Sequence, residues 1–207
     1  MHSSSRVLAF FLLSVVLGGS TVAYGQDYRR AVYIQPQPQK APGDLIRKQD
    51  DPRITVRLMS TTGPDNSRVY VSLSKQRAYL INTTTDEIVI DSPISSGKAG
   101  HSTPRGSYTI KQKDRDHRSS IYGDFVDRSG RTVRRGVSTK IDSAPSGTSY
   151  VGASMKWFMR LTNEGVGMHT GFLPGYAASH GCVRMPEQIA QMFYERVRVG
   201  TPAVVAD

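Results

Sequence analysis

The chain has 207 residues, of which 38% are hydrophobic and 21% are charged, and its formal net charge is +10 at pH 7. Its one cysteine excludes an internal disulfide. In an oxidising compartment such a cysteine indicates an intermolecular bridge, a reactive thiol or a buried inert thiol. A basic protein kept in the cytosol would suggest nucleic acid as its partner, so the charge has to be interpreted together with the expected location.

The first 25 residues have the pattern of a secretory signal peptide. Arg6 precedes a run of 13 mostly apolar residues, Val7 to Gly19, whereas a helix that spans a bilayer needs about 20. Small residues at Ala23 and Gly25 predict cleavage before Gln26, with an uncleaved anchor as the alternative. We therefore expect export to the periplasm or cell envelope, no transmembrane anchor after cleavage, and cell-wall polymers rather than nucleic acid as nearby polyanions.

Residues 26–66 are predicted to form a Pro/Gln-rich flexible leader. The stretch Gln35 to Gly43 favours extended chain because its prolines prevent a helix. Breakers follow at Asp50 to Pro52 and at Thr61 to Asn66, and the alternation in Ile54 to Leu58 predicts an added edge strand. A single folded domain is expected over residues 67–207.

From Arg68 the hydrophobic pattern has a period of two, with Val69, Val71 and Leu73 on one face. Short strands are predicted at 78–81, 88–90, 107–110, 121–126, 132–133, 154–161 and 203–205, with a hairpin turn at 127–130. This pattern indicates a mainly β domain, a sandwich or barrel-like fold. One short helix is predicted after Pro186 from the apolar stripe Ile189, Met192, Phe193 and Val197, ending at Gly200.

The segment Gly167 to Pro186 contains most of the residues able to do chemistry. It holds the only cysteine, Cys182, together with His169, His180 and Arg184. A cysteine reacts as its thiolate, and a nearby imidazole forms the thiolate by taking the proton. His169 lies 13 positions before Cys182 and reaches it if the two arms of the segment lie side by side. His180 would require a sharp reversal of the chain.

The sequence from His169 to Pro186, His-Thr-Gly-Phe-Leu-Pro-Gly-Tyr-Ala-Ala-Ser-His-Gly-Cys-Val-Arg-Met-Pro, resembles the signature of the L,D-transpeptidase catalytic domain. In that family a histidine is followed, after a variable loop, by Ser/Thr-His-Gly-Cys-x-Arg. The segments 69–80, 92–106 and 154–161 are similar to family segments in the same order, so the resemblance covers roughly residues 67–200. Family members often have Gly or Ala where this chain has Thr170, but the family uses the main-chain carbonyl there.

The resemblance implies roles for the central residues. Cys182 would be the nucleophile and His169 the base, with the carbonyl of Thr170 holding the imidazole in one tautomer. Backbone N–H groups around Gly181 and Cys182 would bind the oxyanion of a tetrahedral intermediate. The hydroxyl of Ser179 would stabilise the turn. His180 would line the oxyanion side or act as a structural, hydrogen-bonding histidine.

Several other residues keep two interpretations. Arg184 would bind a substrate carboxylate or tie the loop to the fold. Trp157 shares a predicted strand face with Met155 and Met159, which indicates core packing or the border of a substrate pocket. The basic segment 105–135, with nine Lys/Arg against four Asp, would be a solvated β-hairpin surface or a binding patch.

A metal centre is conceivable but not expected. His101, His180 and Cys182 could form a zinc site, yet their spacing resembles no metal motif. We therefore expect neither a metal nor a cofactor.

The resemblance implies an enzyme that acts on peptidoglycan stem peptides. A thiolate at Cys182 would attack the carbonyl at the L-centre of meso-diaminopimelate in a tetrapeptide stem and release D-alanine. An amine of a second stem would then take the acyl group, which gives a 3→3 crosslink. With water as acceptor the protein would be an L,D-carboxypeptidase, and with a lysine of an envelope protein it would be an anchoring enzyme. A non-catalytic wall-binding module is the alternative from another class, although the retained Cys182 and His169 argue against it.

Overall fold

The structure is a computed structural model that describes residues 46–207. The expected signal segment, residues 1–25, and leader residues 26–45 lie outside the described residues. The fold is mainly β, with 41% strand and 9% helix, as the sequence predicts. None of the helices within residues 46–207 is long and apolar enough to cross a bilayer.

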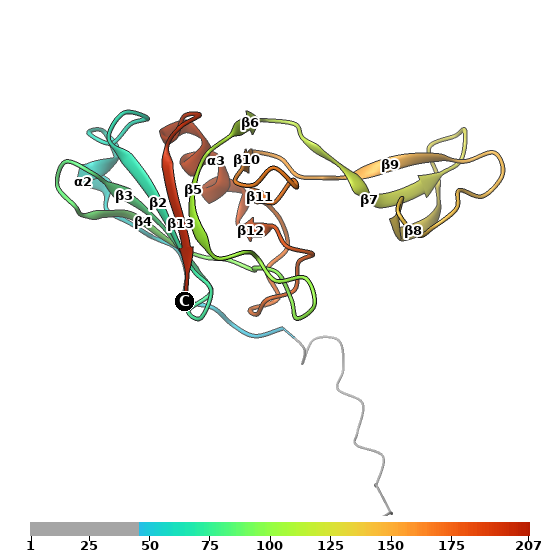
Figure 1. Cartoon of the computed structure of the whole chain (residues 1–207), viewed down its shortest axis with the longest axis horizontal. Coiled ribbons are helices and arrows are strands. Elements are labelled where there is room, and N and C mark those ends of the chain that lie inside the picture. The colour runs from blue at the N-terminus through green and yellow to red at the C-terminus, as the bar shows by residue number, and fades with distance from the viewer. Residues whose placement is uncertain (1–45) are drawn as a thin grey trace, which may run out of the picture. The chain divides into compact units, whose positions relative to one another are not determined.

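The larger sheet has six strands, which come from distant parts of the sequence (Figure 1). The C-terminal strand pairs in parallel with the first long strand, so the end of the chain lies inside the sheet. Its order is β1 (Arg53–Ile54), β4 (Ile88–Pro93), β3 (Arg77–Asn82), β2 (Ser67–Ser72), β13 (Pro202–Ala206) and β5 (Gly106–Thr109).

The second sheet has four strands and contains both arms of the reactive segment. Its order is β12 (Val183–Met185), β11 (Gly167–Thr170), β10 (Phe158–Arg160) and β6 (Gln112–Asp114). Strands β11 and β12 are parallel, whereas the other pairs are antiparallel. Side chains from both sheets, such as Leu80, Ile90, Met159 and Met168, belong to one buried core.

Helix α3 (Glu187–Arg196) follows β12 directly and packs on β10 and β11. Pro186 is its N-cap residue, and Ile189, Ala190 and Phe193 are buried. The predicted stripe is confirmed at Ile189 and Phe193, because apolar residues four apart face the same side of a helix. The helix ends at Arg196 instead of Gly200, and Val197 is buried in an extended conformation after its last turn. The helix supports the reactive segment from the core side.

Three further strands form an arm that extends from the four-stranded sheet (Figure 1). They are β7 (Arg118–Val126), β8 (Thr132–Ser138) and β9 (Ser149–Ser154). The predicted turn between β7 and β8 is confirmed, and its first residue, Asp127, accepts hydrogen bonds from the backbone N–H groups of Ser129 and Arg131, each 3.0 Å long. Gly123 is needed in this arm because a Cβ there would lie 2.2 Å from the carbonyl oxygen of Val151.

The prediction of one continuous strand over residues 154–161 is wrong. Strand β9 ends at Ser154, β10 begins at Phe158, and Trp157 between them has a left-handed φ of +58°. The chain passes from the arm into the body here, and the N–H groups of Met155 and Trp157 bond instead to carbonyls of the segment between β6 and β7. Met155, Trp157 and Met159 therefore do not share a strand face.

The end of the expected leader belongs to the folded domain. Only Arg53–Ile54 forms a strand, and the predicted continuation to Leu58 is instead a short helix, α2 (Val56–Met59). Leu58 is buried in the core while Val56 is exposed. Burial of Leu58 in the core thus favours a helical turn over the strand that the alternating pattern predicts.

Candidate active site

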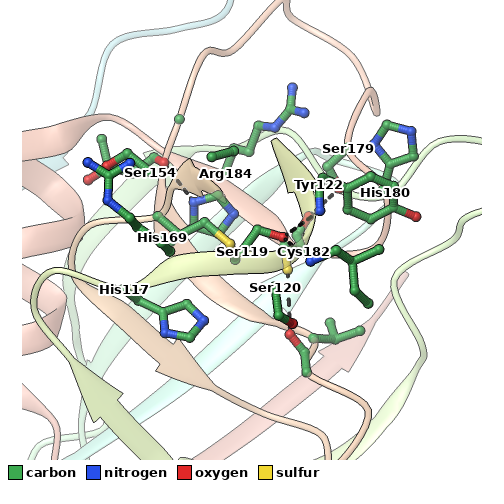
Figure 2. Close-up of a pocket in the computed structure, with 18 of the residues that line it drawn as sticks. His117, Ser119, Ser120, Tyr122, Ser154, His169, Ser179, His180, Cys182 and Arg184 are labelled. Carbon is green, nitrogen blue, oxygen red and sulfur yellow. Dashed lines mark hydrogen bonds between the residues drawn. The ribbon is translucent and has the colours of Figure 1, made fainter. Parts of the chain in front are cut away.

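The parallel pairing of β11 and β12 brings the two arms of the reactive segment side by side. His169 on β11 is the register partner of Arg184 on β12, and Cys182 is the second residue before Arg184. His169, Cys182 and Arg184 all line one cavity of about 640 Å³ (Figure 2). The parallel pairing of β11 and β12 thus brings His169 and the segment that contains Cys182 to the same cavity.

His169 is buried and has a fixed tautomer. Its Nδ1 lies 2.7 Å from the carbonyl oxygen of Thr170, and because a carbonyl only accepts, Nδ1 carries the proton and Nε2 keeps its lone pair. Burial lowers the pKa of His169 from 6.5 to about 4, although the bond to Thr170 acts in the opposite direction. The imidazole is thus neutral at pH 7 and able to accept a proton.

Cys182 is largely enclosed, and in this resting geometry its Sγ lies 3.8 Å from the carbonyl oxygen of Gly165. Burial raises the pKa of the thiol, while the N–H of Gly167 and the positive charges of Arg184 and Arg160 lower it. With the pKa of His169 at about 4, the resting pair is an uncharged thiol and an uncharged imidazole. A reaction in which this thiol acts as a nucleophile would therefore need proton transfer to accompany the attack.

The turn from Ser179 to Cys182 is held by one buried hydroxyl. Ser179 Oγ accepts a 3.1 Å hydrogen bond from the N–H of Gly181 and donates to the carbonyl of Cys182. Gly181 has a φ of +121°, a conformation that side chains disfavour. The N–H of Gly181 is thus occupied, whereas the N–H of Cys182 makes no hydrogen bond to any residue in the 46–207 range. Of the two expected oxyanion donors, Cys182 is the one left free in this conformation.

His180 takes part in an aromatic stack at the rim of the site. Its exposed ring stacks on Tyr122 with centroids 4.4 Å apart (Figure 2). The ring also meets the edge of His101, with centroids 5.0 Å apart. Burial, followed by the positive charge of Lys98, lowers the pKa of His180. The ring connects the catalytic loop to strand β7 by stacking, instead of by the hydrogen bond expected for a structural histidine.

Arg184 is fixed by its backbone and free at its guanidinium. Its N–H and carbonyl bond to Ser95, at 2.9 and 3.0 Å, and its aliphatic part fills the space beside Gly171, where a Cβ would lie 2.8 Å from Arg184 Cγ. Burial lowers the pKa of this arginine, and within the described part of the chain its guanidinium has no hydrogen-bond or ion-pair partner. A half-buried, unpaired guanidinium at a cavity wall is suited to binding a carboxylate.

Trp157 does not line the catalytic cavity. Its ring meets the edge of Tyr194 on α3, and the guanidinium of Arg115 lies 4.9 Å from the ring centroid. Its expected contribution to substrate binding is therefore not supported by this geometry. Tyr122 and His117 line the cavity instead. The sequence pattern did not indicate them, because only the folding of the arm brings them to the same cavity as Cys182.

No metal centre is formed by the expected candidates. His101 contacts the ring of His180, and throughout residues 46–207 no three His, Cys, Asp or Glu side chains are placed to hold one metal ion.

A short segment before β1 fastens the catalytic loop from outside. The N–H of Arg47 donates a 2.8 Å hydrogen bond to the carbonyl of Pro174, and its guanidinium lies 5.9 Å from the centroid of Tyr176. Gly175 is required between them, because a Cβ there would lie 1.9 Å from the carbonyl oxygen of Arg47. Gln49 adds a 3.0 Å bond to the carbonyl of Ile94. We call residues 47–49 the clasp.

Over residues 66–205 the sequence matches the L,D-transpeptidase catalytic domain family (YkuD), and the chain belongs to that family. The curated protein named "Probable L,D-transpeptidase 3" of Mycobacterium tuberculosis is 29% identical over 120 residues. This match covers 56% of the chain and 38% of the relative, so the chain spans well under half of that protein's length.

Solved structures share the same fold. An L,D-transpeptidase from Mycobacterium smegmatis is 20% identical with a TM-score of 0.50, over 68% of this chain and 58% of the other. L,D-transpeptidase 3 from Mycobacterium tuberculosis, solved with a faropenem-derived adduct, is 19% identical with a TM-score of 0.50, over 69% of this chain and 60% of the other. At these identities the likeness establishes the fold alone.

Proposed function

We propose that the protein is an exported peptidoglycan L,D-transpeptidase in which Cys182 is the nucleophile and His169 is the base. The observation that carries the proposal is that Cys182, His169 and the unpaired Arg184 all line one cavity. Acyl transfer from a carboxylate-bearing peptide requires a thiol, a base in the correct tautomer and an anion site. Family membership supports peptidoglycan stem peptides as the substrate class.

The first half-reaction forms a thioester. Arg184 binds a carboxylate of a tetrapeptide stem, which places the carbonyl at the L-centre of meso-diaminopimelate beside Sγ. As Sγ attacks, its proton passes to Nε2 of His169, and the N–H of Cys182 donates to the developing oxyanion. The carbonyl of Thr170 stabilises the imidazolium, which then gives its proton to the departing amine of D-alanine. No step needs a cofactor or a metal.

The second half-reaction transfers the acyl group to an amine of another stem, which gives a 3→3 crosslink. The acceptor is the least constrained element, since water or a lysine of an envelope protein would use the same thioester. The proposed location, the periplasm or cell envelope, rests on the signal-like sequence of residues 1–25. There the substrate is an extended polymer adjacent to the exported domain.

The test is to incubate the purified protein with muropeptides that carry tetrapeptide stems and to identify the products by mass spectrometry. The proposed function predicts release of D-alanine and dimers joined through diaminopimelate. Hydrolysed tripeptide alone would identify an L,D-carboxypeptidase, and an adduct only with an added envelope protein would identify an anchoring enzyme. Absence of any turnover, with muropeptide binding retained, would leave the non-catalytic module.

A further inference from the structure

Besides His169 and His180, a third histidine, His117, lines the cavity and is fixed by its own partners. His117 lies between β6 and β7 and lines the same cavity as His169 and Cys182 (Figure 2). Its Nδ1 is 2.9 Å from a carboxylate oxygen of Asp114. Its ring stacks on Phe158, with centroids 4.2 Å apart and planes 13° apart. Its position is therefore set by a hydrogen bond and a ring stack together.

The partners of His117 also decide its tautomer. A carboxylate only accepts hydrogen bonds, so Nδ1 carries the proton and Nε2 of the neutral ring keeps a lone pair. His169 has the same arrangement, with Nδ1 bonded to the carbonyl of Thr170. The two imidazoles have Phe158 as a common neighbour, because that ring also lies 6.4 Å from His169. Of the three imidazoles that line the cavity, His117 and His169 are thus the two held by a hydrogen bond at Nδ1, and each keeps a lone pair on Nε2, whereas His180 is held by ring stacking.

The mechanism given above uses only one of these bases, although an amine acceptor presents two protons to remove. An alkylamine is an ammonium ion at pH 7, since its pKa is about 10, and an ammonium ion has no lone pair for attack. It must lose one proton before attack and a second as the amide forms. The second proton passes through His169 to the sulfur of Cys182, which leaves as the thiol. The first proton needs a separate acceptor.

We propose that His117, oriented by Asp114 and Phe158, is the base that removes the first proton from the acceptor amine. This inference rests on the proposed function and extends it to the second half-reaction. Overall, the thioester and the ammonium ion give an amide, the free thiol of Cys182 and one proton. Nε2 of His117 takes that proton and releases it to solvent, which its side chain reaches because it is 20% exposed. The Asp114 carboxylate stabilises the imidazolium in between.

The location of His117 at the root of the arm suits this role. The backbone carbonyl of His117 accepts a 2.9 Å hydrogen bond from the N–H of Met155. The segment that enters the arm and the segment that leaves it are therefore linked at this residue. An acceptor that enters along the arm would meet His117 before it reaches the thioester. His169, in contrast, is buried on β11, whose partner strand β12 begins directly after Cys182.

The experiment lets two acceptors of equal size compete for one acyl-enzyme at pH 7. Ethylamine is almost fully protonated at this pH, whereas methoxyamine, which has nearly the same shape, is almost fully unprotonated. With a tetrapeptide stem as donor, the ratio of ethylamide to methoxyamide product is measured by mass spectrometry. This ratio depends neither on the acylation rate nor on the fraction of folded enzyme. The proteins compared are wild type, His117→Gln, Asp114→Asn and the control His101→Gln, whose site lies outside the cavity lining.

We expect His117→Gln to lower the ethylamide-to-methoxyamide ratio by about 10²-fold, the usual contribution of a general base. Asp114→Asn should lower it by a smaller factor, and His101→Gln should match wild type. An unchanged ratio in His117→Gln, or an equal loss of both products, would overturn the inference and indicate a purely structural residue. If wild type releases no D-alanine from the stem, the proposed function itself fails. That result differs from normal release with an unchanged ratio.

Discussion

His169 is expected to make the stability of the protein depend on pH in a defined direction. The pKa of this imidazole is about 4 in the folded protein, against an ordinary value of 6.5, because the ring is buried. Between these values the unfolded chain binds a proton that the folded protein does not, so unfolding is favoured as the pH falls. The stabilising contribution is fully present above pH 6.5 and is lost progressively down to about pH 4. The difference between 6.5 and about 4 corresponds to about 3 kcal/mol.

The measurement is urea denaturation of wild type and His169→Gln at a series of pH values between about 7.5 and 4. Carboxylates such as Glu87 and Asp127, whose pKa values are lowered by hydrogen bonding, also reduce stability in acid. Their effect is the same in both proteins and cancels in the difference. Wild type should lose about 3 kcal/mol more than the variant over this range. Parallel curves would show that His169 is not held neutral, and an opposite slope would indicate an imidazolium paired with a thiolate.

Four further outcomes are expected. Cys182→Ala, or one equivalent of iodoacetamide, should abolish D-alanine release while circular dichroism and thermal unfolding show a retained fold, and residual release would contradict a cysteine mechanism. The alkylation rate of Cys182 at neutral pH should fall about 10²–10⁴-fold in His169→Ala and recover only at a pH above the pKa of the thiol, which burial raises from its ordinary value; if His180→Ala shifts that profile instead, the two histidines have been assigned the wrong way round. Ser179→Ala should lower the free energy of unfolding by about 1–3 kcal/mol, because the turn loses a buried hydroxyl that bonds on both sides, and urea denaturation measures this loss. EDTA should leave turnover unchanged, and restoration by zinc after a loss would revive a Cys/His metal site.

The features that were predictable from the sequence are those set by local pattern. The alternation at Val69 and Val71 specifies a strand with one buried face, and the stripe ending at Phe193 specifies the helix. The pairing of the segment that contains His169 with the segment near Cys182 was also predictable, because a sharply turning Gly- and Pro-rich loop joins the two segments and favours their lying side by side. These inferences need only neighbouring residues and the geometry of strands and helices.

The missed features depend on contacts between distant parts of the chain. The left-handed Trp157 breaks a strand pattern because the chain changes sheets there. Tyr122 joins the site through the arm, and its ring meets His180 only after the arm has folded. His117 gave no sequence signal, since its partners Asp114 and Phe158 come from different strands. Residues of these kinds become visible only with tertiary structure.

The clasp at residues 47–49 shows that the folded domain extends upstream of the segment that matches the family. The family match begins at residue 66, so a fragment cut at that boundary would retain Cys182, His169 and Arg184. It would nevertheless lose the bond from Arg47 to Pro174, in the loop between β11 and β12, and the bond from Gln49 to Ile94, just after β4. Such a fragment would contain the proposed reacting groups without this outer support of the loop. Recombinant fragments intended for inhibitor binding should therefore begin upstream of Arg47, and a protease that cuts between the clasp and β2 would uncouple the loop from its outer support.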